Sequence, residues 1–106
     1  MPYGTGYWRG NDERDFTELS PERQAELLDW ISTHLYPIKT INYAHDSACI
    51  RGLIDLGPGK DSYFSNGQFK GAMLIAGFRV ANKNALNWHF NISERSDVPW
   101  PGKYNR

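Results

Sequence analysis

The residues best suited to catalysis lie close together between positions 45 and 49. His45 and Asp46 are adjacent and could act as an acid–base pair, and Cys49 follows His45 by about one helical turn. A Cys–His nucleophile also needs both side chains in one cleft with a donor for the oxyanion. Adjacency in sequence does not supply that arrangement, and a lone cysteine commonly packs as a small apolar residue. We therefore interpret Cys49 as a packing residue and expect a protein that is not an enzyme.

No metal or cofactor is expected from the sequence. The three histidines are scattered along the chain and the single cysteine has no CxxC partner, so no ligand set with zinc spacing exists. Residues 57–60 (GPGK) superficially resemble a phosphate-binding loop. The first glycine of that motif is missing, however, and Asp61 stands where Ser or Thr would hold magnesium. We interpret this segment as a helix stop followed by a turn.

Polar and basic residues that could contact nucleic acid lie in the second half of the chain. They are Gln68, Lys70, Arg79, Lys83 and His89. Gln68 and Lys70 fall in the first turn of a predicted helix and could read base edges, whereas Arg79 and Lys83 could contact phosphates. His89 is predicted on the polar face of a strand, as an exposed imidazole or as a contact residue. The formal net charge of zero argues against simple nonspecific binding, so nucleic-acid binding is the alternative hypothesis.

Acidic residues are concentrated near the start of the sequence. The first 31 residues hold seven acidic and three basic side chains, a net charge of −4, and the remainder sums to +4. Glu22, Glu26 and Asp29 share the outward face of the first predicted helix, and Asp15 and Glu18 extend this face if the preceding turn is helical. We call these five residues the acidic ridge. Such a stripe is commonly a solvated face, or it could bind a basic groove on a partner protein.

Length and composition indicate one domain. The 106 residues suffice for a single core, and 40% hydrophobic with 14% aromatic residues indicate that the chain folds. No apolar run could span a bilayer, no N-terminal segment resembles a secretion signal, and one cysteine suits a reducing cytosol. We therefore expect a cytoplasmic protein without a membrane partner, whose domain covers residues 1–106. Aromatic tails rich in Gly and Pro, at about 1–12 and 96–106, are expected to anchor on the domain.

Local signals predict two helices in the first half of the chain. Ser20 is a suitable N-cap and Pro21 suits the first helical position, so a helix should run to about residue 34 or 35, before the next proline. Residues 37–43 are then expected to be extended. A capping Asp or Ser precedes a second predicted helix, from residue 48 to about 56, which a Gly-Pro-Gly stop should end.

The clearest predicted helix lies between Asn66, a suitable N-cap, and Gly77, which tolerates the left-handed conformation at a helix end. Its buried stripe follows the i, i+3, i+4, i+7 pattern and comprises Phe69, Ala72, Met73 and Ala76. The opposite face is also largely apolar and comprises Gly71, Leu74 and Ile75. A helix that is apolar on both sides is either covered on both sides or leaves part of its surface for a partner.

Two short strands are predicted after this helix. Residues 78–80 and 87–92 alternate, with Trp88, Phe90 and Ile92 on one face, and residues 81–85 are predicted to turn. We expect the two strands to pair with each other on the central helix. The expected fold is a compact single α+β domain of three helices and a small antiparallel β-ribbon. This is the order of a winged-helix domain, with the central helix as recognition helix and residues 78–92 as the wing.

The stretch YFSNGQFKGAMLIAGFRV…NWHFNIS, within residues 63–93, resembles a pattern found in small proteins encoded by bacteriophages, prophages and mobile elements. Ile41-Asn42 and Asp46-Ser47-Ala48 resemble the lead-in of the same proteins, whereas the acidic first helix is not part of the pattern. The resemblance implies an accessory factor that regulates transcription or blocks a bacterial defence, as anti-CRISPR proteins do. It implies no catalytic residue.

These observations together predict a stoichiometric, non-enzymatic inhibitor of a bacterial defence complex, of the anti-CRISPR type, in the cytoplasm of the bacterial host. The expected partner is a host protein or ribonucleoprotein complex, bound through the acidic ridge of Asp15, Glu18, Glu22, Glu26 and Asp29. The alternative is a winged-helix-like DNA-binding regulator that uses Gln68, Lys70, Arg79, Lys83 and His89. No cofactor is expected in either case.

Overall fold

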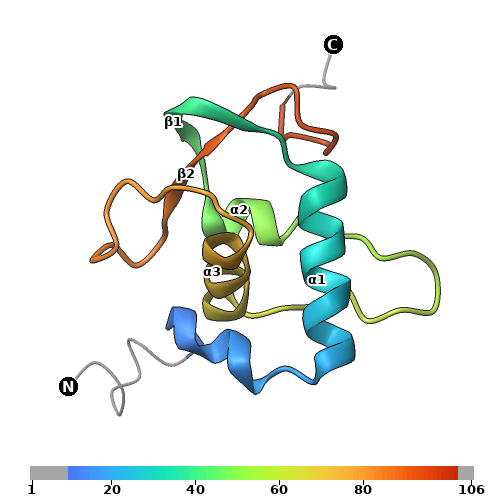
Figure 1. The fold of residues 1–106 in the computed structure, drawn as a ribbon. Helices are drawn as coiled ribbons and strands as arrows, with labels where there is room; N and C mark the ends of the chain where they lie inside the picture. The colour runs from blue at the N-terminus through green and yellow to red at the C-terminus, as the bar shows by residue number, and fades with distance from the viewer. Residues whose placement is uncertain (1–9, 103–106) are drawn as a thin grey trace.

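The computed structural model describes residues 10–102, in which the helix α3 (Asn66–Ile75) lies between the other helices (Figure 1). It packs against a 3-10 helix, η1 (Glu13–Glu18), against α1 (Pro21–His34) and against the short α2 (Ser47–Arg51). A two-stranded sheet formed by β1 (Pro37–Asp46) and β2 (His89–Ile92) completes the domain. The predicted single α+β domain is therefore confirmed. The prediction of three helices is not, because residues 10–102 contain four when η1 is counted.

Helix α1 forms as its local signals predict. The Ser20 side chain accepts a hydrogen bond from the backbone N–H of Arg23 at 3.2 Å, and Pro21 occupies the first helical position. The helix ends at His34, and the Leu35 N–H still bonds to the Ile31 carbonyl. Its inner face buries Leu27, Trp30 and Ile31, which fix α1 on the core.

Helix α3 has well-defined caps at both ends. Ser65, not Asn66, is its N-cap: the Ser65 hydroxyl accepts from Gln68 N and the Gln68 side chain accepts from Ser65 N, a reciprocal capping box. At the other end Gly77 has φ +94°, as predicted. The bonds from Gly77 N to the Leu74 carbonyl and from Phe78 N to the Met73 carbonyl form a Schellman motif.

Both faces of α3 are covered over most of its length. Phe69, Ala72 and Met73 are fully buried as predicted, whereas Ala76 is exposed because the last turn lies at the mouth of a pocket. On the opposite face η1 lies directly on Gly67 and Gly71. A Cβ atom at Gly71 would lie 2.3 Å from the Glu13 carbonyl oxygen, so that close approach requires a glycine.

The sheet does not form the predicted wing. Strand β2 pairs antiparallel with β1, in a register that places Pro37 opposite Ile92 and Asp46 opposite His89. Residues 78–80 contribute an isolated bridge between Val80 and Phe90. The Asn91 side chain explains part of this difference, because its Oδ1 accepts from Arg79 N and its Nδ2 donates to the Ile38 carbonyl. A side chain thus connects residues 78–80 to β2 where the predicted ribbon would have backbone pairing, and the winged-helix order is not confirmed.

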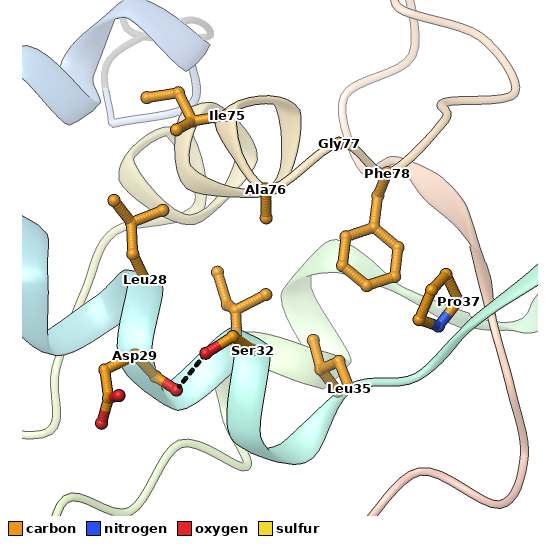
Figure 2. A pocket seen from close by; sticks show the side chains of 10 residues that line it. Leu28, Asp29, Ser32, Leu35, Pro37, Ile75, Ala76, Gly77 and Phe78 are labelled. Atoms are coloured by element: carbon orange, nitrogen blue, oxygen red, sulfur yellow. Dashed lines mark hydrogen bonds between the residues drawn. The ribbon is translucent and has the colours of Figure 1, made fainter.

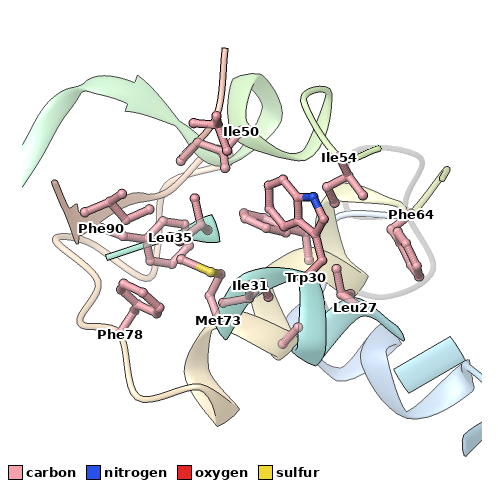
Figure 3. Close-up of a cluster of buried hydrophobic side chains, with 14 of the residues drawn as sticks. Leu27, Trp30, Ile31, Leu35, Ile50, Ile54, Phe64, Met73, Phe78 and Phe90 are labelled. Carbon is pink, nitrogen blue, oxygen red and sulfur yellow. The ribbon is translucent and has the colours of Figure 1, made fainter. Parts of the chain in front are cut away.

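One hydrophobic core joins the helices to β2 (Figure 3). The predicted inward residues Trp88, Phe90 and Ile92 are all buried, and the Phe90 ring packs edge-on against Phe69 at a centroid distance of 6.1 Å. This T-shaped geometry is favourable for aromatic pairs. Helix α2 contributes Ile50 but is shorter than predicted, because it ends at Arg51 and the chain continues through turns.

The predicted aromatic tails are described in part. Trp100 is buried, and its indole N–H donates to the Glu94 carbonyl oxygen at 3.0 Å, so this part of the C-terminal tail is anchored as expected. Residues 10–12 pack on α3 through the bond from Gly67 N to the Gly10 carbonyl. The aromatic residues of segment 1–9, and Tyr104, lie outside the described residues.

Candidate functional site

The five residues of the acidic ridge do not all share one exposed face. Glu18, Glu22 and Asp29 are exposed. Glu26 is half-buried and forms an ion pair with Arg23 at 2.7 Å. The prediction that Asp15 extends the exposed face is wrong. Asp15 is 5% exposed, because η1 turns it toward Gly67 in the first turn of α3. That position suits a carboxylate, since a helix N-terminus carries partial positive charge.

An apolar pocket of about 520 Å³ lies between α1 and the C-terminal end of α3 (Figure 2). We define the apolar pocket by Leu28, Leu35, Pro37, Ile75 and Phe78. Ile75 is 61% exposed at the edge of this pocket, so the pocket is open to a partner on that side. Asp29 of the ridge lies at the rim, and its carboxylate points away from the apolar side chains. The pocket and the ridge therefore meet at Asp29.

A second pocket, of about 530 Å³, lies between β1 and the segment after α3. We define this basic pocket by Tyr43, Leu74, Phe78, Arg79, Val80 and Lys83. Arg79 and Lys83 are exposed, and Tyr43 is 68% exposed with its ring centroid 5.3 Å from that of His89. Three of the five predicted nucleic-acid residues thus come together here. The sequence alone does not identify Tyr43 as a site residue, because its place in the same pocket as Arg79 depends on the position of β1 in the fold.

The other two predicted nucleic-acid residues have internal roles. Lys70 is fully buried: its Nζ donates to the Asn11 carbonyl oxygen at 2.9 Å and lies 4.8 Å from the centre of the Trp88 ring. Burial lowers the pKa of Lys70, and the nearby carboxylates of Glu13 and Asp12 raise it in part. The Gln68 side chain is used in the capping box. The first turn of α3 is therefore not an exposed surface for reading bases, which corrects the prediction for Lys70.

The residues considered for catalysis are engaged separately. His45 stacks on Trp100 at a centroid distance of 3.9 Å, and its Nε2 lies 2.8 Å from a carboxylate oxygen of Glu94. The Asp46 carboxylate accepts from the backbone N–H of Cys49 and caps α2, so it does not pair with His45. Burial, with a further contribution from Asp46, raises the pKa of the Cys49 thiol. The thiol is therefore protonated at neutral pH, a poor state for a nucleophile.

Within residues 10–102, no group of three or more His, Cys, Asp or Glu side chains is placed to hold a metal ion. No helix in the same range combines the length and the apolar character needed to cross a membrane. Comparisons of the chain with family models, curated proteins and solved structures returned no match. What the protein binds must therefore be inferred from its own surface.

Proposed function

We propose that the protein is a stoichiometric inhibitor, encoded by a phage or mobile element, that binds and occludes a basic surface of a bacterial defence complex. The observation that supports this proposal is that the exposed carboxylates of α1 extend to the apolar pocket, where Asp29 lies at the rim. Glu22 and Asp29 are both exposed and lie about 10 Å apart along the helix axis. Protein interfaces commonly combine such an apolar centre with a charged rim.

The rigidity of α1 makes this surface suitable for binding. The helix is capped by Ser20 and held on the core by Leu27, Trp30 and Ile31, so its carboxylates keep their spacing without a partner. Binding then requires little ordering of the backbone, which lowers its entropic cost. Carboxylates on such a face accelerate encounter with a Lys- and Arg-rich surface, while an apolar anchor in the pocket slows dissociation. The expected partner surface is a basic one that presents an exposed apolar side chain.

The experiment measures how well the protein protects an infecting phage in bacterial strains that each carry one defence system. The double variant Glu22→Lys/Asp29→Lys should lose protection, because it reverses the charge of Asp29 at the rim of the apolar pocket and that of Glu22, which is exposed about two turns away on α1. Asp61→Lys/Asp97→Lys is the matched control, since it changes the net charge equally at two exposed carboxylates outside α1, whose contacts with Arg23 and His34 of α1 are long, at 3.8 and 3.5 Å. Inhibition of the purified target should saturate at equimolar inhibitor and weaken at higher salt. Inhibition at far below equimolar amounts, or equal protection by both double variants, would contradict the proposal.

A DNA-binding regulator is the second candidate, and the gathering of Arg79, Lys83 and His89 beside the basic pocket favours it. The structure changes how such a regulator would work. Helix α3 is covered by η1 and Lys70 is buried, so contacts would come from the segment after α3. Titration of wild type and Arg79→Ala/Lys83→Ala with duplex DNA tests this candidate. Sequence-selective binding that the double variant loses would support it over the inhibitor.

A further inference from the structure

We infer that the basic pocket is a binding site for single-stranded nucleic acid, in which one unstacked base packs against Tyr43 and the flanking phosphates meet Arg79 and Lys83. Among the described residues, the site shares Phe78 alone with the apolar pocket that was assigned above to a protein partner. The inference rests on the shape, apolar lining and charge of the basic pocket. It does not depend on the protein being an inhibitor.

The lining of the basic pocket combines the two kinds of group that single strands require. Its base is apolar, with Leu74, Phe78 and Val80, and an exposed aromatic side chain stands at its edge. None of the residues that line it is acidic, whereas Arg79 and Lys83 are both exposed. Single-strand sites typically join a positive groove with aromatic side chains on which bases stack.

The geometry favours an unpaired base over a duplex. A volume of about 530 Å³ lies within the range of small-ligand pockets, so a single base could enter it. A base inside a duplex is stacked and cannot enter a pocket without being flipped out. The Tyr43 ring is 68% exposed and already stands against His89, which limits its motion and leaves its outer face for a base.

Three hydrogen bonds that involve its backbone hold the segment with the positive charges in place. Arg79 N donates to Asn91 Oδ1, Ala81 N donates to the His89 carbonyl, and the Trp88 indole N–H donates to the Lys83 carbonyl. The Arg79 guanidinium also donates to the Lys39 carbonyl of β1, and both Arg79 and Tyr43 line the pocket. The backbone that carries Arg79 and Lys83 is therefore already in place, which reduces the entropy lost on binding.

The test is fluorescence anisotropy with labelled oligo(dT) and oligo(U) of about ten nucleotides, and with a duplex of the same length. Wild type should bind the single strands more tightly than the duplex. Tyr43→Ala should weaken single-strand binding by about 5- to 140-fold, the usual effect of losing one stacked base. Tyr63→Ala is the matched control, because Tyr63 is 65% exposed and lies outside the pocket. The affinities for oligo(dT) and oligo(U) show whether single-stranded DNA or RNA is the better ligand.

Lys83→Ala tests the phosphate contact separately. Between about 50 and about 200 mM salt, its slope of log affinity against log salt should be shallower than that of wild type by about 0.7. Lys60→Ala, at an exposed lysine on another loop, should leave the slope unchanged. Far-UV spectra and melting temperatures show that each variant is folded. Equal affinity for duplex and single strand, an unchanged affinity in Tyr43→Ala, or no binding of either oligonucleotide would overturn the inference.

Discussion

The substitution Gly71→Ala tests the packing of η1 on α3, which determines how the first part of the chain joins the domain. An added Cβ would lie 2.3 Å from the Glu13 carbonyl oxygen and 2.6 Å from the Phe16 Cβ. Both distances are well below van der Waals contact. The neighbour at the shorter distance is backbone, so rotation of a side chain cannot relieve that clash, and η1 has to move away from α3.

Two effects of opposite sign determine how much Gly71→Ala changes the free energy of unfolding. Replacing a helical glycine by alanine stabilises a helix by up to about 1 kcal/mol. Overpacking of this kind costs about 1 to 3 kcal/mol. Detachment of η1 would instead expose Phe16, which is 4% exposed, at a cost of about 1.5 to 3 kcal/mol. The overpacking term should prevail, and we expect a net loss of about 1 to 2 kcal/mol in the free energy of unfolding.

Urea unfolding followed by tryptophan fluorescence measures this loss, since Trp30, Trp88 and Trp100 are all buried. Gly52→Ala is the matched control. The nearest atom to its added Cβ is a carbonyl oxygen at 3.4 Å, and Gly52 has φ −68°, which alanine adopts readily. Gly52→Ala should therefore leave stability nearly unchanged. If Gly71→Ala proved as stable as wild type or more so, the close contact between η1 and α3 would be refuted.

Two further predictions concern buried ionisable groups. Because burial lowers the pKa of Lys70 below its unfolded value, the unfolded state binds more protons between the two values. The stability of wild type relative to Lys70→Met should therefore rise with pH through that alkaline window, as measured by urea titrations at several pH values; a difference that is flat or falls would contradict the burial of a charged amine. Because burial and Asp46 raise the pKa of Cys49, its reaction with an aromatic disulfide reagent should be slow at neutral pH and should accelerate above the ordinary thiol pKa. Rapid labelling of the folded protein at pH 7, with Cys49→Ala as the blank, would show an activated thiolate instead.

Elements with local signals could be predicted from the sequence. The Ser20-Pro21 start of α1 and the Gly77 end of α3 depend on residues within one turn of the helix terminus. The N-cap of α3 was misplaced by one residue because Ser65 and Asn66 are both good caps. The glutamine three residues after Ser65 completes a capping box and favours Ser65, so the sequence did contain the deciding signal.

Features that depend on distant contacts could not be predicted in the same way. Lys70 appeared exposed because it is charged, but its partner, the Asn11 carbonyl, is 59 residues away in the chain. The pairing of β2 with β1 depends on contacts across more than 40 residues, as between Asp46 and His89. The same distinction between local signals and distant contacts applies to the candidate site. The basic residues were identifiable by type, whereas their meeting with Tyr43 follows from that pairing.

The close packing of η1 on α3 gives a structural reason for the sequence pattern on which the proposed resemblance to phage proteins rests. Within SNGQFKGAM, Ser65 and Gln68 cap the helix, Gly67 and Gly71 accommodate the η1 backbone, and Lys70 binds a carbonyl of the same N-terminal segment. These residues are therefore constrained by the seating of one part of the chain on another. Two proteins could inherit this pattern unchanged and still differ in every residue that meets a partner. Shared ancestry of the scaffold would then be visible in the pattern, while divergence of targets would be recorded on α1 and around the two pockets.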